Sequence, residues 1–171
     1  GASRGIGKEI AKLFAAEGAR VACTARTVEE GAHRLAGSLD ATLAEIADAG
    51  GEAIAIAGDV SSFPECERIV RSAREALGPI DVLVNNAALT YFIPVAEFPV
   101  EKWLKSFAVN LHGPFFMSRL VLSEMIARGS GGLPALNAAV PQESTRKYAA
   151  SPRRSRRSSS TAWAEGDRHT L

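Results

Sequence analysis

The sequence predicts an α/β protein with a doubly wound parallel sheet, in which helices cover both faces of the sheet. Two observations favour this fold class. Short apolar runs typical of buried strands alternate with longer runs of helical period, which is the pattern of parallel sheets. A glycine-rich stretch at residues 1–7 opens the first helical run, at residues 8–17, and Gly18 closes that run. The 171 residues, 46% of them hydrophobic, fit one globular domain with a sizeable core.

The glycine-rich stretch has the properties of a turn that holds a dinucleotide. A pyrophosphate approaches the backbone closely only where no Cβ intervenes, and the free N–H groups at a helix start attract anions. The glycine spacing differs from the common G-x-G-x-x-G fingerprint, and an ordinary tight turn before a helix is the alternative. We predict a Rossmann-like cofactor site at this turn, made by Gly1, Ser3, Arg4, Gly5, Ile6 and Gly7.

The next strand predicts which dinucleotide binds. Residues 19–25 are apolar and end at Arg26. In the common NAD pattern an acidic residue about twenty positions past the turn binds the ribose 2′-hydroxyl, whereas a cation there favours the 2′-phosphate of NADP. Arg4 supplies a second positive group. We therefore predict NADP rather than NAD as the cofactor, with two solvated surface arginines as the alternative.

A second strand carries a carboxylate to the same edge of the sheet. A helix is predicted from residue 38 to residue 46, and Gly50-Gly51 ends it. Residues 53–57 form the next apolar strand, which is followed by Gly58-Asp59-Val60. We predict that Asp59 and Val60 belong to the cofactor site, with the carboxylate of Asp59 accepting from the adenine amino group. Another amphipathic helix begins near Pro64.

Residues 79–84 form the clearest predicted strand, and Asn85-Asn86-Ala87-Ala88 follow it. Two amides at a strand end can tie neighbouring strands together, while small alanines leave room for a ribose or nicotinamide. We predict that Asn86 and Ala87 line the cofactor site, and a turn capped by asparagine is the alternative. A long helical pattern starts at residue 100, and Asn110 lies within it, where asparagine is a poor helix former. That position predicts a special role.

Four segments together resemble the short-chain dehydrogenase/reductase family over residues 1–132. They are Gly1-Ala2-Ser3-Arg4-Gly5-Ile6-Gly7, Gly58-Asp59-Val60, Asn85-Asn86-Ala87-Ala88 and Phe107-Ala108-Val109-Asn110-Leu111-His112-Gly113. Ala88 stands where the family usually has glycine. The resemblance implies an enzyme that transfers hydride between NADP(H) and an alcohol or carbonyl substrate. It also implies that Asn110 maintains helix geometry and a water-linked proton relay.

The resemblance further implies a tyrosine that acts as general acid or base, beside a lysine that lowers its pKa. Tyr148 fits the start of the family's Tyr-x-x-x-Lys pattern, but Pro152 stands at the lysine position. Proline supplies no cation and disturbs the helix that carries both groups. Alanines occupy the stretch at residues 138–139 where the catalytic serine is expected. We therefore expect an impaired fragment with little or no turnover.

Both ends of the chain depart from an intact domain. No strand precedes Gly1, so we expect an incomplete fold whose first strand is missing. The nucleotide-binding domain is predicted over residues 1–132. Residues 133–171 are predicted to be a disordered tail, because 7 Lys+Arg and only 2 Asp+Glu fall in residues 146–171 with many serines. A reading-frame shift near residue 132 or a natural disordered tail would explain this change.

Two other classes of function compete with the oxidoreductase. One is an inactive dinucleotide-binding module. The other, the least favoured, is a nucleic-acid-binding protein that uses the basic tail, which has almost no interleaved aromatic residues. Histidines and cysteines lack metal-ligand spacing, so no metal site is expected. The isolated cysteines and the absence of a long apolar run favour a soluble cytoplasmic protein, and the long helix allows a homo-oligomer.

Overall fold

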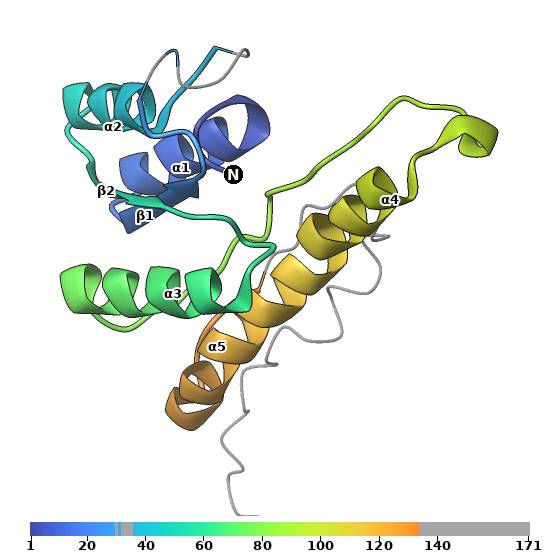
Figure 1. Ribbon diagram of the computed structural model, residues 1–171. Helices are drawn as coiled ribbons and strands as arrows, with labels where there is room; N and C mark the ends of the chain where they lie inside the picture. Colours follow the sequence, from blue (N-terminus) through green and yellow to red (C-terminus); the bar gives the residue numbers. More distant parts are fainter. Residues whose placement is uncertain (30, 32–35, 134–171) are drawn as a thin grey trace, which may run out of the picture.

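The computed structural model describes residues 1–29, 31 and 36–133, and it confirms the alternation of helices and strands (Figure 1). In chain order the elements are α1 (Gly5–Ala16), β1 (Arg20–Ala25), α2 (Leu39–Asp48), β2 (Glu52–Ala57), α3 (Phe63–Leu77), the 3-10 turn η1 (Val95–Glu97), α4 (Val100–Phe107), the π-helical turn η2 (Ala108–His112) and α5 (Gly113–Arg128). Within these residues no helix has the length and apolarity needed to cross a membrane.

Local sequence explains where the helices begin and end. The Ser38 hydroxyl accepts from the backbone N–H of Ala41 at 3.1 Å and caps α2. Pro64 lies in the first turn of α3, where a missing N–H costs nothing. Gly129 adopts a left-handed conformation, with φ of 66°, and ends α5.

β1 and β2 pair in parallel, with a register that runs from Arg20 opposite Glu52 to Ala25 opposite Ala57. Figure 1 shows α1 and α2 on one face of this pair and α3 on the other. Side chains of a strand alternate between its faces. Cys23 of β1 accordingly packs in one core cluster with Ala11 of α1 and Leu39 of α2.

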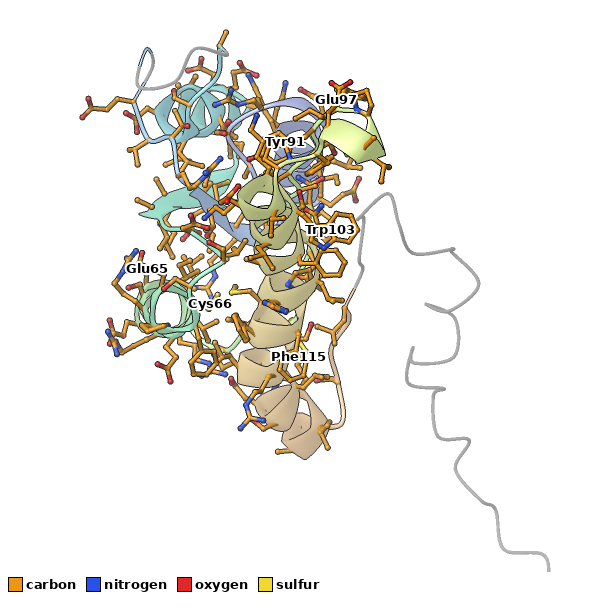
Figure 2. All side chains as sticks on the ribbon, turned by 45° about the vertical axis from the view of Figure 1, so that its right-hand side comes forward. Glu65, Cys66, Tyr91, Glu97, Trp103 and Phe115 are labelled. Atoms are coloured by element: carbon orange, nitrogen blue, oxygen red, sulfur yellow. The ribbon has the colours of Figure 1, made fainter. Side chains whose placement is uncertain are left out.

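The opposite face builds a second core cluster. Ile56 of β2 packs there with Cys66 and Ile69 of α3 and with Met117 and Val121 of α5. Figure 2 shows Cys66 on the side of α3 that faces α5, with Glu65 on the outer side. Helices therefore cover both faces of the sheet, as the doubly wound prediction requires.

The prediction of a strand at residues 79–84 is wrong for the described chain. The segment forms only an isolated parallel bridge, between Val82 and Gly132. A cavity separates the segment from β1, so no backbone ladder joins it to the β1-β2 pair. The segment is apolar but at most half-buried, with Val82 43% exposed, because a strand also needs a neighbour in register.

Candidate nucleotide-binding site

The predicted site residues of four separate segments meet at one edge of the sheet. The N–H of Ala2 donates to the Thr24 carbonyl at 3.0 Å, which places the glycine-rich turn at the carboxyl end of β1. The N–H of Gly58 donates to the Ala25 carbonyl at 3.0 Å, which brings the end of β2 to the same place. The Asn86 amide donates to the Gly1 carbonyl at 3.1 Å. Ligands of open α/β sheets bind at this edge, outside the carboxyl ends of the strands.

Two glycines of the turn have different physical roles. Gly5 begins α1 with φ of 56°, and a Cβ built on it would meet nothing within 4 Å. Its outer side is therefore open. Gly7 is the reverse, because a Cβ there would lie 2.1 Å from the Gly1 carbonyl oxygen and 2.3 Å from the Asn86 amide nitrogen. Gly5 gives a ligand access to the backbone, whereas Gly7 lets the turn pack against Asn86.

The first turn of α1 is suited to an anion. No side chain of the described residues caps it, and it contains no acidic residue. Ile6 is 70% exposed in this turn. The N–H groups of a first helical turn have no partner within the helix, and together with the helix dipole they attract negative charge. This end of α1 therefore fits the pyrophosphate that the glycine pattern predicts.

The two predicted arginines occupy different positions. Arg4 donates through Nη2 to the Thr27 hydroxyl at 3.3 Å and to the Gly37 carbonyl at 3.2 Å, so it holds the segment after β1 against the turn. Arg26 is exposed at the end of β1. Ser3 is buried beneath the turn at 6% exposure, which gives it a packing position. Of these residues, Arg26 offers its cation most directly to solvent or a ligand.

Asp59 lies in a hydrogen-bond network at the end of β2. One carboxylate oxygen accepts from the N–H and the hydroxyl of Ser61, at 2.9 and 2.7 Å, and the other pairs with Lys105 Nζ at 3.2 Å. Burial raises the pKa of the Asp59 carboxyl, but the hydrogen bonds from Ser61 and Lys105 outweigh it, and the net pKa is lowered. Asp59 is therefore ionised near neutral pH. A carboxylate has about four acceptor positions, so it can take a further donor.

Ser61 and Lys105 were missed by sequence reasoning. Ser61 had a usable signal, because an Asp with a serine two positions later is typical of an Asx turn. Lys105 had none, since it reaches Asp59 from α4, 46 residues further along the chain. Val60, the other predicted residue of this segment, packs against the start of α5. A Cβ built on Gly113 would lie 3.1 Å from the Val60 carbonyl oxygen, so the contact is close.

The two amides, predicted to tie neighbouring strands together, instead join residues 85–86 to a helix and to the glycine-rich turn. The Asn85 amide donates to the Ser118 hydroxyl of α5 at 3.3 Å, while that of Asn86 reaches the turn at Gly1. Ala87 packs tightly on the turn as well, because a Cβ on Gly1 would lie 2.9 Å from the Ala87 Cα. Residues 85–87 thus lie along one side of the candidate site, where the strands end.

Asn110 lies in the π-helical turn between α4 and α5. Its Oδ1 accepts from the Leu89 N–H at 2.8 Å, and its Nδ2 donates to the Leu89 carbonyl at 2.9 Å. Such π turns within α-helices are frequent at functional sites. The amide fixes the segment that follows Asn85 and Asn86. Its predicted part in a proton relay stays a prediction, and Tyr148 and Pro152 lie outside the described residues, as does the predicted tail from residue 134 on.

Comparison with known proteins identifies the family. A family model described as short chain dehydrogenase matches residues 1–151. The chain belongs to this short-chain dehydrogenase family. It is 40% identical over 132 residues to an L-rhamnose 1-dehydrogenase (NAD(P)(+)) of Azotobacter vinelandii, a match that covers 77% of this chain and 50% of the relative. The chain spans about half the length of the curated relatives it matches.

Solved structures agree in fold. A metagenomic short-chain oxidoreductase in complex with NADP superposes with a TM-score of 0.72 at 38% identity, over 79% of this chain and 58% of that one. An actinorhodin polyketide ketoreductase with NADPH gives a TM-score of 0.70 at 39% identity, over 79% and 49% of the two chains. The Rossmann-like fold class predicted from the sequence is confirmed. Among the described residues no group of histidine, cysteine or acidic side chains is arranged to hold a metal.

Proposed function

We propose that this chain is the nucleotide-binding part of an NAD(P)-dependent oxidoreductase that acts on an alcohol or carbonyl compound. One observation carries the proposal. The uncapped first turn of α1, open above Gly5, lies at the edge where β1 and β2 end and where Asn86 contacts the turn. Names of relatives support the class of reaction, since they include an L-rhamnose 1-dehydrogenase and a ketoreductase.

Each part of the proposed site has its own task toward NADP. The N–H groups of the first turn of α1 bind the pyrophosphate, and exposed Arg26 binds the 2′-phosphate. Asp59 accepts from the adenine amino group with the acceptor capacity that Ser61 and Lys105 leave. Asn86 and Ala87 bound the space for the ribose and nicotinamide. When bound, the nicotinamide supplies the hydride donor or acceptor of the reaction.

We propose Tyr148 as the general acid or base and Asn110 as the residue that positions the proton relay. Proline at position 152 supplies no cation to lower the pKa of the tyrosine hydroxyl. This substitution favours a second candidate function for the chain, a module that binds the dinucleotide without turnover. The two functions share one cofactor site and differ only in chemistry.

NADPH fluorescence titration tests the site. The proposal predicts saturable binding that is stronger for NADPH than for NADH, since Arg26 pairs with the 2′-phosphate. Arg26→Gln should weaken NADPH binding about tenfold, equivalent to about 1.4 kcal/mol, and leave NADH binding unchanged. Arg71→Gln, on the exposed side of α3, is the matched control. Equal affinities for both nucleotides would contradict the role of Arg26, and rapid NADPH-dependent carbonyl reduction would contradict the inactive module.

We further propose that the chain forms a homo-oligomer through α4 and α5. An apolar stripe follows this helix pair, with side chains that are 39% to 65% exposed: Val100, Trp103, Leu104, Phe107, Leu111 and Phe115. Figure 2 shows Trp103 and Phe115 projecting from the same side of the helix pair, away from Cys66. Exposed apolar patches of this kind mark protein interfaces.

We place the protein in the cytoplasm, because its buried cysteines are free thiols.

A further inference from the structure

A lysine of α4 reaches the end of β2 and contacts both side chains of the Asp59 network. Lys105 Nζ donates to Oδ2 of Asp59 at 3.2 Å and to the Ser61 hydroxyl oxygen at 2.9 Å. The Ser61 hydroxyl in turn donates to Oδ1 of Asp59 at 2.7 Å. The three side chains therefore form a closed ring of hydrogen bonds.

Stability gives little reason for the ion pair between Lys105 and Asp59. Their side chains are 41% and 31% exposed. An ion pair this exposed contributes little to folding, because water screens the two charges. Glu65, whose charge interacts with that of Asp59, is itself paired with Arg68 at 2.7 Å. The cation of Lys105 therefore serves Asp59, and its place beside the candidate site indicates a task in ligand binding.

The ring of hydrogen bonds limits what Asp59 can still accept. A carboxylate has about four acceptor positions, shared by its two oxygens. The N–H and the hydroxyl of Ser61 occupy Oδ1, at 2.9 and 2.7 Å, and Lys105 occupies one side of Oδ2. Within the described chain, the position that remains is on Oδ2, beside the lysine. Rotation of the carboxylate would break bonds on both oxygens, so this position has a fixed direction.

The remaining position can accept a hydrogen bond but cannot donate one. Burial raises the pKa of the Asp59 carboxyl, but the bonds from Ser61 and Lys105 lower it by more, so the carboxyl carries no proton near neutral pH. Adenine presents an amino group, which donates to such an oxygen, whereas guanine and hypoxanthine present a carbonyl oxygen instead. A site built to pair a polar group rejects an analogue that lacks the partner group.

We propose that Lys105 is a positioning residue that makes the nucleotide site selective for adenine over purines with a carbonyl oxygen in place of the amino group. It acts through Asp59, because together with Ser61 it directs the last acceptor position of Oδ2 at the amino group of the base. It also compensates the charge of Asp59 when the base covers the carboxylate and excludes water from it. This inference rests on the proposed dinucleotide site.

Two reduced dinucleotides test Lys105 on the full chain. The probes are NADPH and its analogue in which hypoxanthine replaces adenine, and the fluorescence of the reduced nicotinamide reports the binding of each. Both carry the same phosphates, so the ratio of their dissociation constants reports the base alone. We expect the natural chain to bind NADPH about tenfold more tightly than the analogue, since one hydrogen bond to a charged group is gained. Lys105→Met should reduce this preference to about twofold, and Lys105→Arg should retain most of it.

Lys102→Met is the matched control. It removes the same charge from the exposed side of α4, where Lys102 lies over the ring of Tyr91, and it should keep the full preference for NADPH. Asp59→Asn keeps Lys105 but replaces the oriented carboxylate with an amide, so it should lose the preference. This second variant gives the answer even if Lys105→Met does not fold.

The outcomes separate this inference from the proposed function. No preference in the natural chain, or the full preference in Lys105→Met or Asp59→Asn, would overturn the role of Lys105 while the dinucleotide site stands. An equal loss in Lys102→Met would show an effect of net charge rather than of position, and would also overturn it. Failure of the natural chain to bind either dinucleotide would contradict the proposed function itself, and this inference with it.

Discussion

Gly5 and Gly7 are two residues apart, and the structure predicts different outcomes for an alanine at each. Gly7→Ala places a Cβ 2.1 Å from backbone, so we expect a loss of several kcal/mol, about 3 or more, or failure to fold. Gly5→Ala meets no atom and carries only the strain of its positive φ, about 1 kcal/mol. Urea unfolding of both variants measures the difference. Equal destabilisation would contradict the packing assigned to Gly7.

Asp59 predicts how stability depends on pH. Its pKa is lowered in the folded protein, so its contribution is complete above the ordinary carboxyl pKa of 3.8 and is lost as pH falls through the lower folded value. Asp59→Asn should therefore reduce stability at pH 6 and make its fall below pH 4 shallower. Asp48→Asn, on the exposed end of α2, is the control. A variant curve parallel to that of the natural chain would contradict the network with Ser61 and Lys105.

At the scale of elements, the π-helical turn between α4 and α5 is hydrogen-bonded, through Asn110, to Leu89 in the segment after residue 84. Asn110→Ala removes both hydrogen bonds to Leu89, and we expect a loss of about 1–3 kcal/mol. Hydrogen exchange of the Leu89 amide should become faster, and by a larger factor than the loss of global stability alone would cause. Ser106→Ala is the control, because it removes an exposed hydroxyl from the same helix pair and should change neither quantity. Unchanged exchange at Leu89 in Asn110→Ala would show that the amide does not hold this segment.

The elements also show what a sequence can predict. Helices such as α2 were predictable because capping residues and periodicity act locally, as Ser38 shows. Residues 79–84 were predicted as a strand from apolar composition alone, and they lack a ladder to β1 because pairing depends on distant chain. In the site, Asn86 was found from its position after an apolar run. Lys105 and the Leu89 contact of Asn110 were not, since both depend on contacts between distant segments.

At the scale of the whole molecule, two core clusters lie on the two faces of the β1-β2 pair, and each contains one cysteine. Burial raises the pKa of the Cys23 thiol and that of the Cys66 thiol to about 11. Both thiols therefore stay protonated and unreactive at neutral pH in the folded chain. The nucleotide site depends on both core clusters. Helix α1 packs in one cluster. Helix α5 packs in the other, and its Ser118 accepts the hydrogen bond from Asn85.

The central claim is that the edge formed by α1, β1 and β2 holds a dinucleotide. Thermal unfolding of the purified chain, alone and with excess NADPH or NADH, tests this claim most directly, because a ligand that binds only the folded state raises its stability. We predict a cooperative transition that NADPH moves upward by more than NADH does. A cooperative transition that neither nucleotide moves would show that the chain folds without a working nucleotide site, and would contradict the account.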